Sequence, residues 1–224
     1  MQREVIIVCG VTGSGKSVWS KHLTAKMNRL MVYDTLSEFP VTYMDAEGVA
    51  AWAEKPPAEF RIGVYNPYDT DVLTAAAYVV GNCMLVLEEI STLYKIGARI
   101  DGPLQEAVLL GRHRRLSILA IAQRASYVPV TLRSQASRIV SFRQQEPTDL
   151  KWMEEFLGKE NAQSLPTLPD LHCIDWHKGN VSKYTVPIPG RKSDPTQSNI
   201  DPPESDIDPP NPETSPTDEK EEND

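Results

Sequence analysis

Short runs of apolar residues alternate along this chain with segments whose apolar positions recur every three to four residues. The apolar runs predict buried strands at Val5–Cys9, Leu30–Tyr33, Arg61–Tyr65, Met84–Leu87, Ser117–Ala122 and Arg138–Phe142. The amphipathic segments predict helices over Ser17–Asn28, Ala46–Ala53, Asp71–Val80, Pro103–Gly111 and Thr148–Leu157. Such alternation indicates an α/β fold with a mostly parallel central sheet that helices cover on both faces.

The residue types at the ends of the predicted helices and strands support this fold prediction. Pro103 begins one predicted helix and Gly111 ends it, positions that each residue type favours. Thr148 is expected to cap the last long helix through its hydroxyl oxygen. Farther on, Leu171–Trp176 and Val181–Val186 flank a Gly-Asn turn, which predicts a C-terminal β-hairpin.

The pattern of buried elements ends near Pro187. The segment Ser193–Asp224 holds seven of the 18 prolines, no aromatic residue and two isoleucines as its only large apolar residues. Such a segment buries too little apolar surface to offset the entropy lost on ordering. We therefore expect one domain over residues 1–190 and a disordered, acidic, Pro-rich tail over 191–224.

The formal net charge of −8 is distributed very unevenly. The segment Ser193–Asp224 has eleven acidic residues and one lysine, a net charge of −10, which leaves +2 for the remaining 192 residues. Ala107–Gln145 contains seven arginines and no acidic residue, at Arg112, Arg114, Arg115, Arg124, Arg133, Arg138 and Arg143. A negative total therefore does not exclude a nucleic-acid partner, because the arginine-rich stretch could meet phosphates.

Cysteine content and hydropathy limit the class of protein further. The three cysteines, Cys9, Cys83 and Cys173, are too few and too scattered for a disulfide framework or a metal cluster. No apolar run approaches the roughly 20 residues of a membrane helix, and the N-terminus does not resemble a signal peptide. These features predict a soluble, cytosolic protein without a membrane span.

A complete phosphate-binding motif follows the first predicted strand. The residues Gly10, Val11, Thr12, Gly13, Ser14, Gly15, Lys16 and Ser17 match GxxxxGK[ST], between a strand and a helix as that motif requires. Backbone N–H groups of such a loop face the phosphates of a nucleotide, and the start of the next helix strengthens that field. Lys16 would contact the β- and γ-phosphates and the Ser17 hydroxyl would ligate Mg²⁺. The alternative, a chance Gly-rich turn, does not explain this context.

Two carboxylates, Glu88 and Glu89, follow the apolar run Met84–Leu87. Ligands of open α/β sheets bind at the carboxyl ends of the strands, and Mg²⁺ prefers oxygen ligands. Glu88 fits the metal-side carboxylate, and Glu89 fits the base that polarises an attacking water. The alternative is an acidic pair that caps the next segment at the surface, and the division of roles between the two glutamates stays open.

Gln123 follows the predicted strand Ser117–Ala122. A neutral amide at a strand tip beside the phosphate loop could sense the γ-phosphate or position water. It could equally be an ordinary polar residue at a strand end.

Several of these features occur together in one known family. They are, in chain order, Gly10–Ser17, Leu85–Glu89, Gly111–Arg115 ahead of Leu116–Gln123, and Leu132–Ala136 ahead of Arg138–Phe142. Over residues 3–188 the chain resembles the HerA–FtsK class of P-loop ATPases, and is most similar to the small genome-packaging ATPases of membrane-containing double-stranded DNA viruses. The resemblance implies the RecA-like (ASCE) P-loop fold, a three-layer sandwich around a mostly parallel sheet. The extra N-terminal barrels of cellular members do not fit ahead of Val5, which favours the viral branch.

The resemblance also implies a function. Family members are Mg²⁺-dependent ATPases that form rings, usually hexamers, with ATP between subunits, and they move double-stranded DNA. Carried over by position, Gln123 is the phosphate sensor, Arg112 or Arg115 is the arginine that completes a neighbour's site, and Arg138 is a weaker candidate. The viral members imply capsid or portal-vertex partners, and a location in the host cytoplasm and virion. Glu88 departs from the family, which more often has Asp there.

Two other functions fit the same motifs. A small-molecule kinase uses a P-loop scaffold, and the arginine-rich stretch could be its lid. A phage assembly or secretion ATPase would act on protein instead of DNA. The acidic tail is expected to favour solubility; a sharper hypothesis is that it competes with DNA for the arginines or docks on a capsid partner.

Overall fold

The computed structural model of this chain describes residues 3–95 and 97–187. The expectations for the tail, residues 191–224, lie outside these residues. Within them, one sheet has the strand order β3-β4-β2-β5-β6-β1-β7-β8-β9. Its strands are β1 (Val5–Cys9), β2 (Arg29–Tyr33), β3 (Thr42–Tyr43), β4 (Phe60–Val64), β5 (Met84–Leu87), β6 (Ser117–Ala122), β7 (Arg138–Ser141), β8 (His172–His177) and β9 (Asn180–Thr185).

The strands β1 to β7 pair in parallel, so that their carboxyl ends meet at one edge of the sheet. Cys9, the last residue of β1, pairs with Ala122 of β6 on one side and with Ser141 of β7 on the other. On the far side of β6, Leu87 of β5 pairs with Ala120. The residues that follow β1, β5, β6 and β2 therefore lie next to one another at this carboxyl edge.

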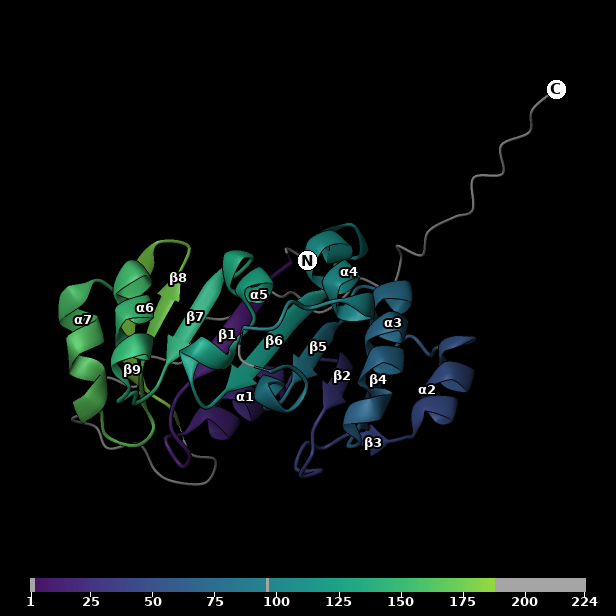
Figure 1. The fold of residues 1–224 in the computed structure, drawn as a ribbon. Coiled ribbons are helices and arrows are strands. Elements are labelled where there is room, and N and C mark those ends of the chain that lie inside the picture. Colours follow the sequence, from purple (N-terminus) through teal and green to yellow (C-terminus); the bar gives the residue numbers. More distant parts are fainter. Residues whose placement is uncertain (1–2, 96, 188–224) are drawn as a thin grey trace.

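Helices cover both faces of the sheet, as expected, but very unevenly (Figure 1). Alternate residues of β1 point to opposite faces, Ile7 to a large apolar cluster and Ile6 to a smaller one. The large cluster receives side chains from α2 (Ala46–Ala53), α3 (Thr70–Val80), α4 (Gly102–Leu110), α5 (Val130–Ser134), α6 (Pro147–Leu157) and α7 (Lys159–Ser164). The smaller cluster is covered by α1 (Lys16–Thr24), which buries Trp19 there. The predicted α/β sandwich with a C-terminal hairpin is confirmed.

Three details differ from the sequence prediction. The first helix ends at Thr24, because the chain must turn over residues 25–28 to enter β2 at Arg29. The predicted cap at Thr148 is wrong: α6 begins at Pro147, which needs no N–H partner in the first turn, and Glu146 precedes it. The short elements β3, α5 and α7 were not predicted, because so few residues show no periodicity.

A buried polar chain joins α1 to the C-terminal hairpin. The Arg138 guanidinium, with a fully buried side chain, lies 2.6–3.1 Å from the two carboxylate oxygens of Asp175 on the antiparallel neighbour β8. The Tyr184 hydroxyl donates to Asp175 at 3.1 Å and accepts from the Trp19 indole N–H at 2.7 Å. Arg138 is therefore not available to a neighbouring subunit, and its assignment as a candidate finger is wrong.

The Arg138–Asp175 pair gives a stability prediction. Asp175→Asn keeps the side-chain shape but leaves a buried guanidinium without its counter-charge, so we expect the free energy of unfolding to fall by about 3–5 kcal/mol. The double variant Arg138→Met, Asp175→Leu removes both charges and should lose much less, since Tyr184 keeps Trp19 as a partner. Urea unfolding measures both. A single variant within about 0.5 kcal/mol of wild type, the usual range for surface changes, would contradict the account.

The described residues contain no helix long and apolar enough to cross a membrane.

Candidate functional site

The phosphate-binding motif forms the turn between β1 and α1 at the carboxyl edge of the sheet. Its backbone requires glycine at Gly13 and Gly15, where φ is +77° and +117°. A Cβ at Gly15 would also lie 3.0 Å from Cε1 of Phe142 and 3.1 Å from Cα of Leu171. Conformation and packing thus both hold the loop in the shape that directs its amides to one point.

Lys16 extends from the start of α1 back across this loop. Its ammonium donates to the carbonyl oxygen of Gly10 at 2.7 Å and to that of Val11 at 3.1 Å. Burial lowers the pKa of Lys16, and the nearby Glu89 carboxylate opposes that shift. An ammonium held inside the loop is positioned to exchange carbonyl partners for phosphate oxygens.

Ser17 and Glu88 meet although they are 71 positions apart in the chain. The Ser17 hydroxyl donates to Oε1 of Glu88 at 3.1 Å, while Oε2 of Glu88 is buried without a hydrogen-bond partner among residues 3–95 and 97–187. A hydroxyl, a carboxylate and an unsatisfied buried oxygen form a hard donor set that suits Mg²⁺ completed by phosphate and water. Ser17 and Glu88 are the residues that would hold this ion. In the described part of the chain, no group of three or more His, Cys, Asp or Glu residues offers another metal site.

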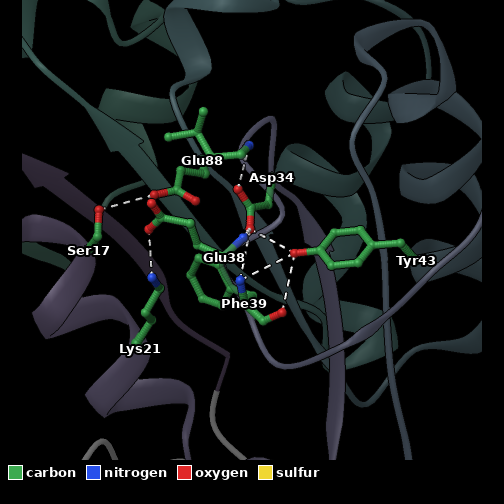
Figure 2. Close-up of polar contacts among 8 residues, drawn as sticks. Ser17, Lys21, Asp34, Glu38, Phe39, Tyr43 and Glu88 are labelled. Atoms are coloured by element: carbon green, nitrogen blue, oxygen red, sulfur yellow. Dashed lines mark hydrogen bonds and ion pairs between the residues drawn. The ribbon is translucent and has the colours of Figure 1, made fainter.

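The environment of Glu88 strongly favours its neutral form. Burial raises its pKa to about 7, and the adjacent Asp34 carboxylate adds to the effect, whereas the Ser17 hydroxyl and Lys21 act in the opposite direction. Figure 2 shows Glu88 between Ser17 on α1 and Asp34 at the end of β2. A cation at this position would offset the repulsion between the two carboxylates.

Glu89 differs from Glu88 in its backbone conformation and in its side-chain partner. Its backbone adopts a left-handed conformation, with φ of +55°, and its carboxylate accepts a hydrogen bond from the Ser91 hydroxyl. A non-glycine residue in this region is strained, and such strain is typical of functional sites. Glu89 is also the carboxylate with the largest electrostatic effect on Lys16. The two glutamates therefore have different partners: Glu88 accepts from the Ser17 hydroxyl, whereas Glu89 accepts from Ser91 and acts on Lys16 through its charge alone.

Gln123 also lies at this edge. It follows β6, which separates β1 from β5, and its side chain is exposed. Its backbone carbonyl accepts from the Gln144 side-chain amide at 3.5 Å. The strand order therefore places Gln123 between the phosphate loop and the two glutamates.

The structure does not place Arg112 and Arg115 with these residues. Both precede β6, in or directly after the 3₁₀ turn Gly111–Arg114, and both are exposed at the amino edge of the sheet. The length of β6, roughly 20 Å at 3.3 Å per residue, separates them from the phosphate loop. Neither can act on the nucleotide of its own chain, so only a role at a neighbouring subunit's site is compatible with this geometry.

Acidic residues farther along the chain pair with part of the arginine-rich stretch. Arg124 pairs with Asp149 at 2.9 Å, and Arg143 pairs with Asp170 at 2.9 Å. With the buried Arg138–Asp175 pair, at least three of the seven arginines have an acidic partner within residues 3–95 and 97–187. Arg112, Arg114 and Arg115 are all exposed in or directly after the turn at the amino edge.

Sequence reasoning missed Asp34, which is completely buried against Glu88. A signal was present, because Asp34 directly follows the predicted strand Leu30–Tyr33 and so belongs at the same edge as the glutamates. Its importance was hidden because no local pattern shows that β2 pairs with β5.

Fold and motif together are those of the α/β P-loop fold. No family model matches the sequence, and no curated protein does. Among solved structures, the genome packaging NTPase B204 from Sulfolobus turreted icosahedral virus 2 in complex with AMPPCP superimposes with a TM-score of 0.68 at 21% identity, covering 83% of this chain and 98% of B204. B204 from Sulfolobus turreted icosahedral virus gives 0.64 at 20% identity, covering 84% and 100%. VirB4 of Thermoanaerobacter pseudethanolicus gives 0.54 at 10% identity, covering 82% and 89%. These likenesses show the fold, which is the one that the resemblance to HerA–FtsK ATPases implies.

The raised pKa of Glu88 predicts how Glu88→Gln changes stability. The folded chain binds the Glu88 proton more tightly than the unfolded chain does, so this group's contribution to stability decreases as pH rises from about 4.5 to about 7. Without nucleotide, Glu88→Gln should therefore match wild type at pH 5 and melt about 3 °C or more above it at pH 8. Scanning fluorimetry measures this, and the exposed Glu106→Gln is the control. An equal difference at both pH values would contradict the assignment.

Proposed function

We propose that this chain is an ATP-driven translocase that packages double-stranded DNA into a preformed viral capsid. The observation that carries the proposal is the Ser17–Glu88 contact, with Glu89 and Gln123 at the same edge, in a chain that shares its fold with the packaging NTPase B204 over 98% of B204. The B204 structures contain AMPPCP and ATP-gammaS, which supports nucleotide binding by this chain.

Different residues carry out different parts of ATP hydrolysis. Loop amides and the Lys16 ammonium bind the phosphates, and Mg²⁺ on Ser17 and Glu88 would neutralise charge on the β- and γ-phosphates. Glu89 accepts the proton of the water that attacks the γ-phosphorus, as the bond to the ADP oxygen breaks. Gln123 contacts the γ-phosphate and distinguishes ATP from ADP.

The site of one chain is incomplete, because no arginine of the amino-edge turn reaches it. A ring, with a hexamer as the favoured form, supplies Arg112 or Arg115 from the neighbouring subunit to stabilise charge in the transition state. The remaining exposed arginines of that turn are candidates for DNA phosphates, a contact that is salt-sensitive and independent of sequence. Such a motor docks on capsid or portal-vertex proteins, in the host cytoplasm and in the virion.

ATP hydrolysis with and without duplex DNA tests the proposal. Wild type should be stimulated by duplex DNA, and less so as salt rises, because phosphate contacts release counterions. Glu89→Gln should reduce kcat by about 10²-fold or more while it retains nucleotide binding. Normal hydrolysis by Glu89→Gln would contradict its role. A phosphorylated small-molecule product would favour the kinase, and activity indifferent to DNA would favour a protein substrate.

Mixing variants tests the ring. Arg112→Ala or Arg115→Ala should abolish hydrolysis if that arginine is the finger. Glu89→Gln should be nearly inactive for a different reason, because it lacks the base that accepts the proton of the attacking water. In mixed rings, some interfaces combine an intact Glu89 with an intact neighbouring arginine, so an equimolar mixture of two inactive proteins should regain activity. Activity that never recovers on mixing would contradict an arginine acting between subunits. Arg124→Ala is a matched control, because Arg124 is paired with Asp149.

A further inference from the structure

Asp34 occupies a fixed position beside the proposed Mg²⁺ ligands. It directly follows β2, where Tyr33 pairs with Leu87 of β5, so that Asp34 and Glu88 leave adjacent strands side by side. The Glu88 N–H donates to the Tyr33 carbonyl at 2.9 Å, and the Asp34 N–H donates to the Val64 carbonyl at 2.9 Å. Both backbones are therefore anchored before their carboxylates face each other.

The Asp34 carboxylate is the centre of a hydrogen-bond cluster (Figure 2). It accepts from the backbone N–H groups of Leu36 at 3.0 Å, Glu38 at 2.6 Å and Phe39 at 2.9 Å, and from the Tyr43 hydroxyl at 2.7 Å. Burial would raise the pKa of Asp34, but hydrogen bonds from Tyr43, Phe39, Glu88 and Leu36 hold that pKa below its ordinary value. Asp34 is thus a buried carboxylate that its hydrogen bonds hold in one position.

The segment 34–43 also contacts α1, the helix that begins in the phosphate loop. Glu38, whose N–H bonds to Asp34, pairs through its carboxylate with Lys21 of α1 at 2.7 Å. The Lys21 ammonium also lies 5.7 Å from the centre of the Phe39 ring. Lys21 lies about one helical turn after Ser17, so the segment contacts the element that carries the metal-binding hydroxyl.

We propose that Asp34 is a positioning residue of the nucleotide site, one that sets the orientation of Glu88 and through it the affinity for Mg²⁺. The fixed Asp34 carboxylate lies against Glu88 on the β2 side, and the Ser17 hydroxyl bonds Oε1 of Glu88 on the α1 side, so that the two contacts together hold the Glu88 carboxyl group in one orientation. Glu88 is one methylene longer than aspartate and so has more orientations to restrict. The inference deepens the proposed function and rests on it for the site being a nucleotide site.

The alternative is that Asp34 only orders the segment 34–43. Asp34→Asn loses the charge and also one hydrogen bond to the segment, because its NH2 group cannot accept from Leu36 while its oxygen accepts from Glu38, Phe39 and Tyr43; the comparison with Tyr43→Phe, which loses one hydrogen bond and keeps the charge, separates the two roles. Asp45→Asn is a matched control: Asp45 caps α2 by accepting from the Gly48 N–H at 2.8 Å and lies outside the site. Tyr43→Phe removes one donor to Asp34 and leaves its charge in place.

The measurement is the affinity for a fluorescent ADP analogue with and without Mg²⁺, beside kcat, KM and melting temperature. We expect Asp34→Asn to reduce the enhancement by Mg²⁺ about tenfold, with metal-free affinity nearly unchanged and kcat affected more than KM. Tyr43→Phe should lower the melting temperature, whereas Asp45→Asn should change it little, because asparagine caps a helix about as well as aspartate. Both variants should change the enhancement less than about twofold. Asp34→Glu, which keeps the charge, should lie between wild type and Asp34→Asn.

Two results would overturn the inference. One is an unchanged Mg²⁺ enhancement in Asp34→Asn; the other is an equal loss in Asp34→Asn and Tyr43→Phe, which would show a purely structural role. If Asp34→Asn does not fold, Asp34→Glu decides, because its displaced carboxylate should lower the enhancement at least threefold where a structural role lowers only stability. A wild type that binds Mg²⁺-nucleotide but ignores duplex DNA would remove the packaging proposal and leave the role of Asp34 intact.

Discussion

The parallel pairing of β2, β5, β6, β1 and β7 is the constraint on which the proposed site depends. Parallel strands bring their carboxyl ends to one edge, and in this order that edge gathers Asp34, Glu88, Gln123 and the phosphate loop. Both faces of the central strands are buried against packed side chains, so a shift of register would disrupt this packing. The fold therefore determines the spacing of polar groups that no local interaction would hold together.

Charge is distributed around this edge in a way that suits a polyanion and a divalent cation. Two adjacent carboxylates, Glu88 and Asp34, differ in environment, since four donors support the charge of Asp34 while burial opposes that of Glu88. The Lys16 ammonium is buried nearby on backbone carbonyls. Arg112 and Arg115 are exposed at the opposite edge, too far from a nucleotide of their own chain to contact its phosphates. The proposed chemistry therefore requires a neighbouring subunit.

Much of the fold and part of the site could be predicted from the sequence. The phosphate loop and the two glutamates were found because each motif lies beside a fully apolar strand, so the local pattern also gives its place at the sheet edge. The partnership of Asp34 with Glu88 and of Arg138 with Asp175 could not be predicted, because each depends on which strands are neighbours. Lone arginines in a basic stretch gave no sign of which would be buried.

The central claim, that this edge binds Mg²⁺-nucleotide through Ser17 and Glu88, is tested most directly by calorimetry of ATPγS binding to wild type and Ser17→Ala. Ser17→Ala removes the hydroxyl that bonds Glu88 and would ligate the ion, and it leaves the loop amides and Lys16 in place. We expect Mg²⁺ to increase the affinity of wild type at least tenfold, and Ser17→Ala to lose most of this increase with its metal-free affinity preserved. An undiminished Mg²⁺ effect in Ser17→Ala would contradict the account.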